Sequence, residues 1–141
     1  MEKLAKHEES MGDFYLACAN IFPDNRDFWQ KISGEEKMHA HWLYNLKSKI
    51  ENNIVYLETE KFTERSITNS MQYLEEEKRN LEGGKYIEEQ AFFIALDLEN
   101  ALIESGNLRL FSSDSSEVKH FLNFLLEETE KHREMIKARI K

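Results

Sequence analysis

Five side chains of metal-ligand type lie in the middle of apolar helical stripes in this 141-residue chain. They are Glu8, Glu36, His39, Glu99 and His132. Each has apolar neighbours at helical spacing; Glu8, for example, lies between Leu4 and Met11. A carboxylate that faces a protein core is costly unless a positive charge compensates it. Several such groups in one small chain therefore predict a shared metal site inside a bundle of helices.

The spacing of Glu36 and His39 suits a common ion. Three residues along an α-helix turn through about 300°, so both side chains lean toward one side of the helix. Iron, manganese and zinc all accept such a mixed set of oxygen and nitrogen ligands. One Glu-x-x-His pair is a weak motif, because acidic helices produce it by chance. The inference therefore depends on the pattern across several helices.

The apolar stripes predict four long helices that would position these side chains. They cover about residues 2–20, 26–51 and 86–108, and a last one that follows the serine-rich break at 112–116 and runs to the C-terminus. The long connection over 53–84 should contain an extra helix, because Ile67, Met71 and Leu74 keep helical spacing within it. The expected fold is an all-α four-helix bundle of two antiparallel helix pairs, with a long crossover, as one domain over residues 1–141.

In di-iron carboxylate bundles, two helices supply one Glu each and two supply a Glu-x-x-His pair. The five candidate ligands fit this scheme in order and in register, because the interval from Glu8 to Glu36 nearly equals that from Glu99 to Thr129. Thr129 stands where the second pair should have its Glu. Glu128 is an alternative ligand, although it lies about 40° around the helix from His132. The Thr129 hydroxyl would then bond to a backbone carbonyl or to a metal-bound water.

The sequence resembles the ferritin-like superfamily, specifically the rubrerythrin-type proteins, over most of its length. The matching stretches are residues 7–15, 32–40 and 95–104, with an imperfect fourth at 125–132. The resemblance implies a ferritin-like bundle around a di-iron centre that reacts with peroxide or dioxygen. It also implies iron cycling between ferrous and ferric states, and pairing of bundles along their sides as a homodimer. Manganese or zinc would suit the same ligands.

Three departures from that family bear on function. Rubrerythrins proper carry a four-cysteine rubredoxin domain, whereas Cys18 is the single cysteine here, so redox turnover would need an external electron donor. The extra carboxylate of peroxidase-type members, one turn from Glu99, is missing. The Glu that bridges both metals in the family is replaced by Thr129. Three carboxylates would then face two ferrous ions and would not neutralise them. Either hydroxide, peroxide or phosphate supplies the remaining negative charge, or only one iron binds.

Charge and hydropathy exclude other classes of partner. The chain has 19 lysine and arginine residues against 27 aspartate and glutamate residues, a formal net charge of −8. It has no clustered basic face, which argues against binding to nucleic acid or to an anionic membrane. No apolar run approaches membrane-spanning length, and the polar N-terminus does not resemble a signal peptide. The expected location is cytoplasmic.

Two functional hypotheses follow from these patterns. The first is a metalloprotein that binds iron and reacts with peroxide or dioxygen, as an oxidoreductase or in iron handling. The second is a degenerate bundle with one metal or none that serves a binding or structural role, in which the same side chains form a buried polar network. Tyr15 is expected either to bond to a ligand carboxylate or only to pack in the core. His7, His41 and His120 are expected to be exposed, because they lie off the main stripes.

Overall fold

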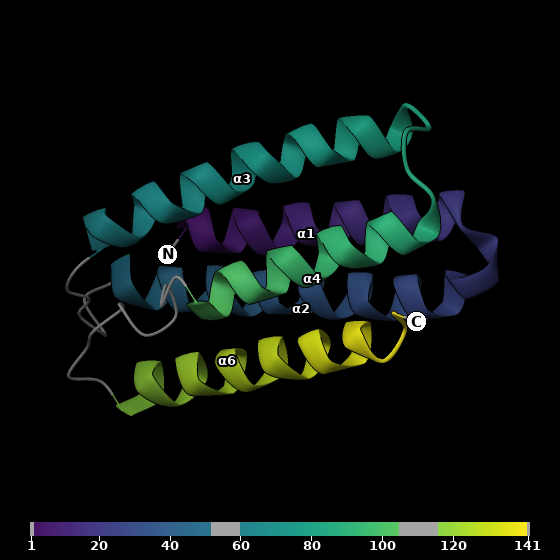
Figure 1. Cartoon of the computed structure of the whole chain (residues 1–141). Coiled ribbons are helices and arrows are strands. Elements are labelled where there is room, and N and C mark those ends of the chain that lie inside the picture. The colour runs from purple at the N-terminus through teal and green to yellow at the C-terminus, as the bar shows by residue number, and fades with distance from the viewer. Residues whose placement is uncertain (1, 52–59, 105–115, 141) are drawn as a thin grey trace.

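The computed structural model describes residues 2–51, 60–104 and 116–140, which are almost entirely helical (Figure 1). The helices are α1 (Glu2–Ile21), α2 (Arg26–Glu51), α3 (Glu60–Glu82), α4 (Glu88–Glu104) and α6 (Ser116–Lys137), with a 3₁₀ turn, Pro23–Asn25, before α2. No strand occurs in these three ranges, which confirms the predicted all-α class. The helix predicted in the long connection is also confirmed, as α3.

Local chemistry sets the ends of α3 and α4. Gly84 has φ 75°, and Lys85 N–H bonds to Asn80 O at 3.1 Å, so a glycine closes α3 in the left-handed conformation. Helix α4 begins at Glu88 because the Gln90 side chain accepts the Ile87 N–H at 2.9 Å and caps the first turn. Residues 105–108 of the helix predicted over 86–108 lie outside the described ranges.

The prediction that the last helix reaches the C-terminus was wrong. Helix α6 ends at Lys137, and the chain continues as a turn. Arg139 N–H bonds to Ile136 O at 3.0 Å and Ile140 N–H bonds to Lys137 O at 3.1 Å, which is the tighter i to i+3 pattern. This turn directs Arg139 toward the start of α2.

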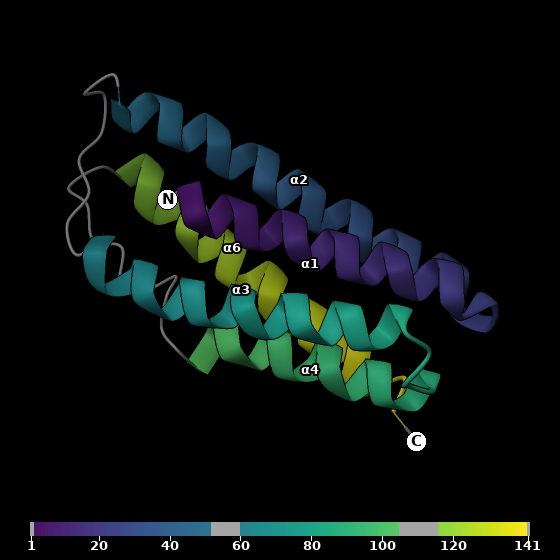
Figure 2. The same ribbon diagram turned by 90° about the horizontal axis from the view of Figure 1, so that it is seen from above.

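The helices pack side by side along their lengths (Figures 1 and 2). Helix α1 runs antiparallel to α2 and α4 runs antiparallel to α6, and both pairs are in contact. Helix α3 lies along α1 and also contacts α4. The α1–α2 turn, the α3–α4 turn and the C-terminal end of α6 all meet at one end of the molecule. Within the described ranges, no helix is long and apolar enough to cross a membrane.

The predicted apolar stripes form the core. Leu4, Met11, Tyr15 and Cys18 of α1 are fully buried, as are Trp29, Ile32 and Leu43 of α2. Ile67, Leu74 and Leu81 of α3 are each only 1% exposed, so the crossover helix contributes to the core. The polar candidates therefore lie within a continuous apolar layer that excludes water from them.

Gly12 allows α1 and α2 to approach closely. A Cβ atom at this position would lie 2.9 Å from Lys37 Cγ and 3.2 Å from the backbone oxygen of Ser33. Ser33 Oγ donates to Gly12 O at 2.7 Å, which ties the two helices at this point. Gly34, inside α2, is the contrasting case. A Cβ at Gly34 would meet nothing within 4 Å, so close packing does not explain that glycine.

These two glycines should respond oppositely to alanine. Gly12→Ala is expected to lower the free energy of unfolding by about 1 kcal/mol, because overpacking outweighs the gain in helix propensity. Gly34→Ala should raise it by about 0.5–1 kcal/mol, since only the helix propensity changes. Urea unfolding followed by circular dichroism measures both. Stabilisation by Gly12→Ala would contradict the close approach of α1 and α2.

Candidate metal centre

The structure brings the five predicted ligands together from four helices. Glu8 lies on α1, Glu36 and His39 on α2, Glu99 on α4 and His132 on α6. Glu8, Glu99 and His132 are 0% exposed, and Glu36 and His39 are 1% and 3% exposed. We call these five side chains the candidate metal centre. Positions that are far apart in sequence therefore converge in the buried layer, as the stripe pattern predicted.

The candidate metal centre consists of two overlapping triads. The first position is Glu8, Glu36 and His39, and the second is Glu36, Glu99 and His132. In each triad, one ligand atom per residue lies within 4.8 Å of the others. Two ligand atoms on opposite sides of one ion are about 4.2 Å apart at bond lengths of about 2.1 Å. Small side-chain movements would therefore close each triad on an ion.

Glu36 is shared by the two positions, and its two oxygens face different histidines. Glu36 Oε1 lies 2.8 Å from His132 Nδ1, and Glu36 Oε2 lies 3.4 Å from His39 Nδ1. The two imidazole rings stack with their centroids 5.6 Å apart. A carboxylate held in this way can give one oxygen to each of two neighbouring ions.

Two further side chains lie beside the second position. Tyr15 O–H donates to Glu99 Oε1 at 2.7 Å, which confirms the predicted bond from Tyr15 to a candidate ligand carboxylate. His132 presents Nδ1 to Glu36 and Glu99, and its other nitrogen, Nε2, lies 3.6 Å from Glu35 Oε2. This separation is beyond hydrogen-bond distance, so Glu35 is a neighbouring carboxylate on the far side of the ring from Glu36. Sequence reasoning missed Glu35; its place directly before Glu36 was the available signal.

Several buried polar atoms in the candidate metal centre have no hydrogen-bond partner. They are both carboxylate oxygens of Glu8, His39 Nδ1, Glu99 Oε2 and His132 Nε2. Unsatisfied polar atoms are rare in protein interiors, and each one requires an explanation. A cation between these groups would satisfy the atoms of Glu8, His39 and Glu99, whereas His132 Nε2 faces Glu35. Without a cation, Glu8 must carry a proton, which it can donate to Glu36.

Burial and mutual repulsion set the charges of the acidic side chains. Burial, with Glu36 and Glu99 nearby, raises the pKa of Glu8 well above its ordinary value. Burial and the charge of Glu36 likewise raise the pKa of Glu99 to about 8. For Glu36, burial acts in the same direction, but a proton on the neighbouring Glu8 and the hydrogen bond with His132 outweigh it and hold its pKa well below the ordinary value. Glu36 is therefore the carboxylate that stays ionised.

His132 supplies the matching positive charge. Burial alone would lower the pKa of His132, but hydrogen bonds to Glu36 and Glu99 outweigh burial and raise it to about 11. Without metal, the second position is therefore an ion pair between His132 and Glu36 at 2.8 Å. A metal ion would have to replace the protons of His132 and Glu99.

Thr129 and Glu128 lie in different environments. Thr129 is 2% exposed, and its Oγ1 donates to Leu125 O at 2.8 Å, which confirms one predicted role for this hydroxyl. Glu128 is half-buried and lies 3.5 Å from Lys131 Nζ, and it belongs to neither triad. The structure therefore does not bring Glu128 to the other five side chains.

His7 is buried, so the prediction that it is exposed was wrong, whereas His41 and His120 are exposed as predicted. Helix α3 covers the face of α1 on which His7 lies. His7 Nε2 pairs with Ser70 Oγ of α3 at 2.8 Å, and Nδ1 has no partner. Burial, partly offset by Glu36, lowers the pKa of His7 to about 4. The apolar stripe on α1 marks one buried face of that helix. His7 lies outside the stripe because the contact of α1 with α3 buries a second face.

His7 should make the metal-free protein sensitive to acid. Its pKa is lower in the folded chain than the ordinary 6.5, so its contribution to stability is complete above pH 6.5 and is lost as pH falls toward 4. We expect His7→Asn to reduce the loss of unfolding free energy over this range by up to about 3 kcal/mol. His120→Asn is the matched control. Equal acid sensitivity in wild type and His7→Asn would show that His7 does not titrate in this way.

Comparisons of the chain with protein families, with curated proteins and with solved structures found no match. The functional inference for this chain therefore depends on its own buried side chains. Those side chains form two glutamate–histidine triads that could each hold a metal ion.

Proposed function

We propose that this chain is a ferritin-like, rubrerythrin-type metal-binding protein, a single domain over residues 1–141 that holds two metal ions in the candidate metal centre. The observation that carries this proposal is the sharing of Glu36 by two buried triads. Glu8 and His39 would complete the first position, and Glu99 and His132 the second. Glu128 is not among the proposed ligands, since it pairs with Lys131.

The order and direction of the helices support the ferritin-like part of the proposal. Helices α1, α2, α4 and α6 supply the ligands in the order expected of that architecture, as two antiparallel pairs. Helix α3 runs the length of the molecule and returns the chain to the end where α2 began (Figure 1). This long crossover is what lets α2 and α4 run in the same direction.

Iron is the proposed metal, because the ligands combine carboxylates and imidazoles, with manganese or zinc as alternatives. Bound iron would supply one-electron redox chemistry toward peroxide or dioxygen. The residues of this chain hold the charges: Glu36 is ionised without metal, whereas Glu8 and Glu99 give up protons when metal binds. Tyr15 orients Glu99 through a hydrogen bond, and Glu35 lies 3.6 Å from His132 Nε2. These 141 residues contain one cysteine, which is buried, so they cannot themselves form the four-cysteine site of a rubredoxin.

Anaerobic loading with ferrous iron tests this proposal. After desalting, we expect two irons per chain, and a near-ultraviolet ferric absorption after peroxide is added. Consumption of peroxide with a chemical reductant would support the oxidoreductase. The Glu36→Ala/His39→Ala double variant should retain no iron, whereas Glu128→Gln should match wild type. A folded wild-type protein that retains no iron would refute the proposal.

A second candidate function follows from Thr129. Its hydroxyl bonds to Leu125 O, so the position of the missing bridging ligand is already satisfied by the backbone of α6. The His132–Glu36 ion pair and the Tyr15–Glu99 bond are also complete without a cation. These contacts favour a bundle with one structural ion or a buried polar network, in which binding replaces redox chemistry.

Restoring the missing carboxylate separates the two candidates. Thr129→Glu should tighten binding of the second metal by about tenfold or more, because ligand charge count controls the affinity of such sites. Thr129→Gln adds the same volume without charge, so it controls for strain in the packed core. Isothermal titration with Co²⁺ gives both affinities. Equal affinities in these two variants would mean that Thr129 does not stand at a ligand position.

A further inference from the structure

A pocket separate from the candidate metal centre lies at the end of the molecule where the α1–α2 turn, the start of α4 and the C-terminal turn meet (Figure 1). It has a volume of about 430 Å³, which is within the range of pockets that hold small molecules. Its lining residues are Asp24, Asn25, Glu88, Glu89, Phe92 and Arg139, and we call it the end pocket. None of these residues belongs to the candidate metal centre. The end pocket is therefore a separate candidate for ligand binding.

The end pocket carries an excess of negative charge. Asp24, Glu88 and Glu89 contribute three carboxylates, against the single guanidinium group of Arg139. Within the described residues, none of these three carboxylates forms a salt bridge. The positive N-terminal end of α4 offsets about half a unit charge, so most of the excess of two negative charges remains. The charge of the lining therefore favours a cationic ligand.

Glu88 is held in place by neutral groups. Asn25 Nδ2 donates to Glu88 Oε1 at 2.7 Å, and the indole N–H of Trp29 donates to Glu88 Oε2 at 3.0 Å. Trp29 is 0% exposed and stacks on Phe92 with the ring centroids 4.7 Å apart, so this carboxylate is attached to the core. Neither donor carries a charge, so the half-buried Glu88 carboxylate remains uncompensated. A carboxylate that is partly removed from water in this way is stabilised by a cationic partner.

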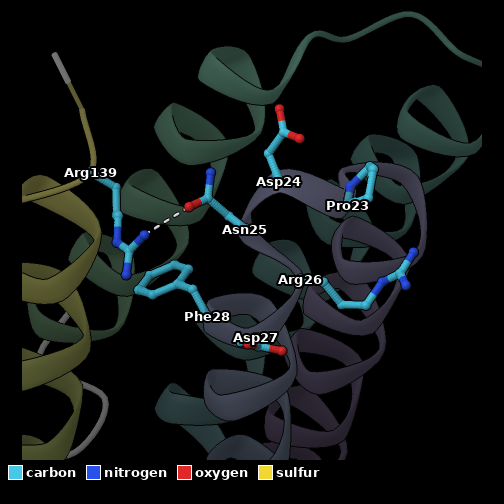
Figure 3. Close-up of a pocket in the computed structure, with 7 residues that line it drawn as sticks. All are labelled: Pro23, Asp24, Asn25, Arg26, Asp27, Phe28 and Arg139. Atoms are coloured by element: carbon cyan, nitrogen blue, oxygen red, sulfur yellow. Dashed lines mark hydrogen bonds between the residues drawn. The ribbon is translucent and has the colours of Figure 1, made fainter.

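The adjoining pocket, of about 340 Å³, shows how this end of the molecule holds a cation (Figure 3). Its charged lining residues are Asp24, Asp27, Arg26 and Arg139. Two guanidinium groups thus match two carboxylates. A guanidinium nitrogen of Arg139 donates to Asn25 Oδ1 at 2.7 Å, and the guanidinium carbon lies 4.6 Å from the centroid of the Phe28 ring. The C-terminal turn therefore places an organic cation against an amide oxygen and an aromatic ring.

We propose that the end pocket binds an aliphatic diamine, with one ammonium group near Asp24 and the other near Glu88 and Glu89. Two ammonium groups match the two excess negative charges, and the methylene groups between them would lie along the Phe92 ring. The carboxylates come from two segments, the turn before α2 and the first turn of α4, so a ligand with two separated charges suits them. In the described residues, groups of three potential metal ligands occur only in the candidate metal centre, so the end pocket is not arranged for a metal ion. The proposal does not depend on metal binding.

Titration of the metal-free protein with 1,4-diaminobutane tests this proposal. The Trp42→Phe background leaves Trp29 as the sole tryptophan, and its bond to Glu88 makes its fluorescence a reporter of the end pocket. The change in fluorescence should saturate as for one site, and calorimetry should give the same dissociation constant. 1-Aminobutane has the same chain length but one charge fewer, so its dissociation constant should be higher by about threefold or more. Mg²⁺ at the same ionic strength should not reproduce the change in fluorescence.

Three exposed positions provide matched variants in this background. Glu89→Gln should raise the dissociation constant of the diamine by about threefold, because it removes one ion pair. Glu127→Gln removes the same charge from α6, outside the end pocket, and should leave the dissociation constant unchanged. Arg139→Gln removes the competing cation from the lining, so it should lower the dissociation constant by about threefold. Circular dichroism checks that each variant is folded.

Several results would overturn the proposal. One is a loss of affinity in Glu127→Gln equal to that in Glu89→Gln, which would reduce the effect to general charge screening. Weaker binding in Arg139→Gln would mean that the pocket uses its guanidinium group for an anionic ligand. Equal affinity for 1-aminobutane, the same fluorescence change with Mg²⁺, or no saturable binding by either method would remove the assignment of a diamine. Because every measurement uses metal-free protein, none of these results bears on iron loading.

Discussion

Replacing Glu36 by glutamine is expected to abolish metal binding at both positions of the candidate metal centre. Glu36 belongs to both triads, and glutamine keeps its size but removes the charge that the ions require. Loss of an orienting group behind a ligand usually costs about 10–100-fold in metal affinity, so loss of the shared ligand should cost more. Competition with a chromophoric chelator during Co²⁺ titration measures this change.

The other ligands should separate the two positions. Glu8→Gln should leave one ion, held by Glu36, Glu99 and His132, and Glu99→Gln should leave the ion held by Glu36, Glu8 and His39. Glutamine at position 36 can still accept a hydrogen bond from His132, so the fold should persist, which circular dichroism checks. If Glu36→Gln bound two ions as tightly as wild type, the shared role of Glu36 would be wrong.

Metal binding at the second position should depend steeply on pH. The pKa of His132 is raised to about 11, by hydrogen bonds to Glu36 and Glu99 that outweigh burial, and the pKa of Glu99 is raised to about 8 by its own burial. Both groups therefore carry a proton at neutral pH that metal must displace. Below pH 8, affinity should rise by about hundredfold per pH unit, and above it by about tenfold per unit.

The Glu8→Gln variant isolates the second position for this measurement. Calorimetry in buffers of different ionisation enthalpy counts the protons released, and two per ion are expected near neutral pH. In the metal-free protein, by contrast, these raised pKa values should make their largest contribution to the free energy of unfolding at low pH. The contribution of Glu99 falls as pH rises from 4.5 to 8, and that of His132 falls from 6.5 to 11. An affinity that does not change between pH 6 and 8 would rule out this charge assignment.

The ligands could be predicted from the sequence because each one interrupts an apolar stripe on its own helix. Glu8 and Glu99 are charged residues at positions where helix packing favours an apolar side chain. The three-residue spacing of Glu36 and His39 is a second, geometric signal. Patterning along a single helix is a local property that the sequence records directly. The identity of the buried polar set therefore required no knowledge of how the helices are arranged.

The supporting residues depend on contacts between helices, which the stripes do not record. Glu35 reaches His132 from α2, and His7 is buried because α3 packs over α1. Gly12 matters through Lys37 and Ser33 of the neighbouring helix. Trp29 and Glu88 meet only when the ends of α2 and α4 are brought together. Each of these pairings is tertiary and has no periodic signature in the sequence.

The His132–Glu36 ion pair explains how the chain can fold before any metal arrives. Removing one partner of a buried ion pair usually costs several kcal/mol, because it leaves an uncompensated buried charge. Here His132 neutralises Glu36, and protons neutralise Glu8 and Glu99, so the empty centre has no such charge. The same protons lower the affinity for metal. In the proposed function, metal binding would therefore exchange these protons for ions.

Anomalous X-ray diffraction from crystals of the iron-loaded protein tests the central claim most directly. The expected result is two iron peaks inside the bundle, both about 2.0–2.2 Å from a Glu36 oxygen. One peak should lie among Glu8, Glu36 and His39, and the other among Glu36, Glu99 and His132. Iron-loaded crystals with no anomalous peak beside Glu36 would contradict the account.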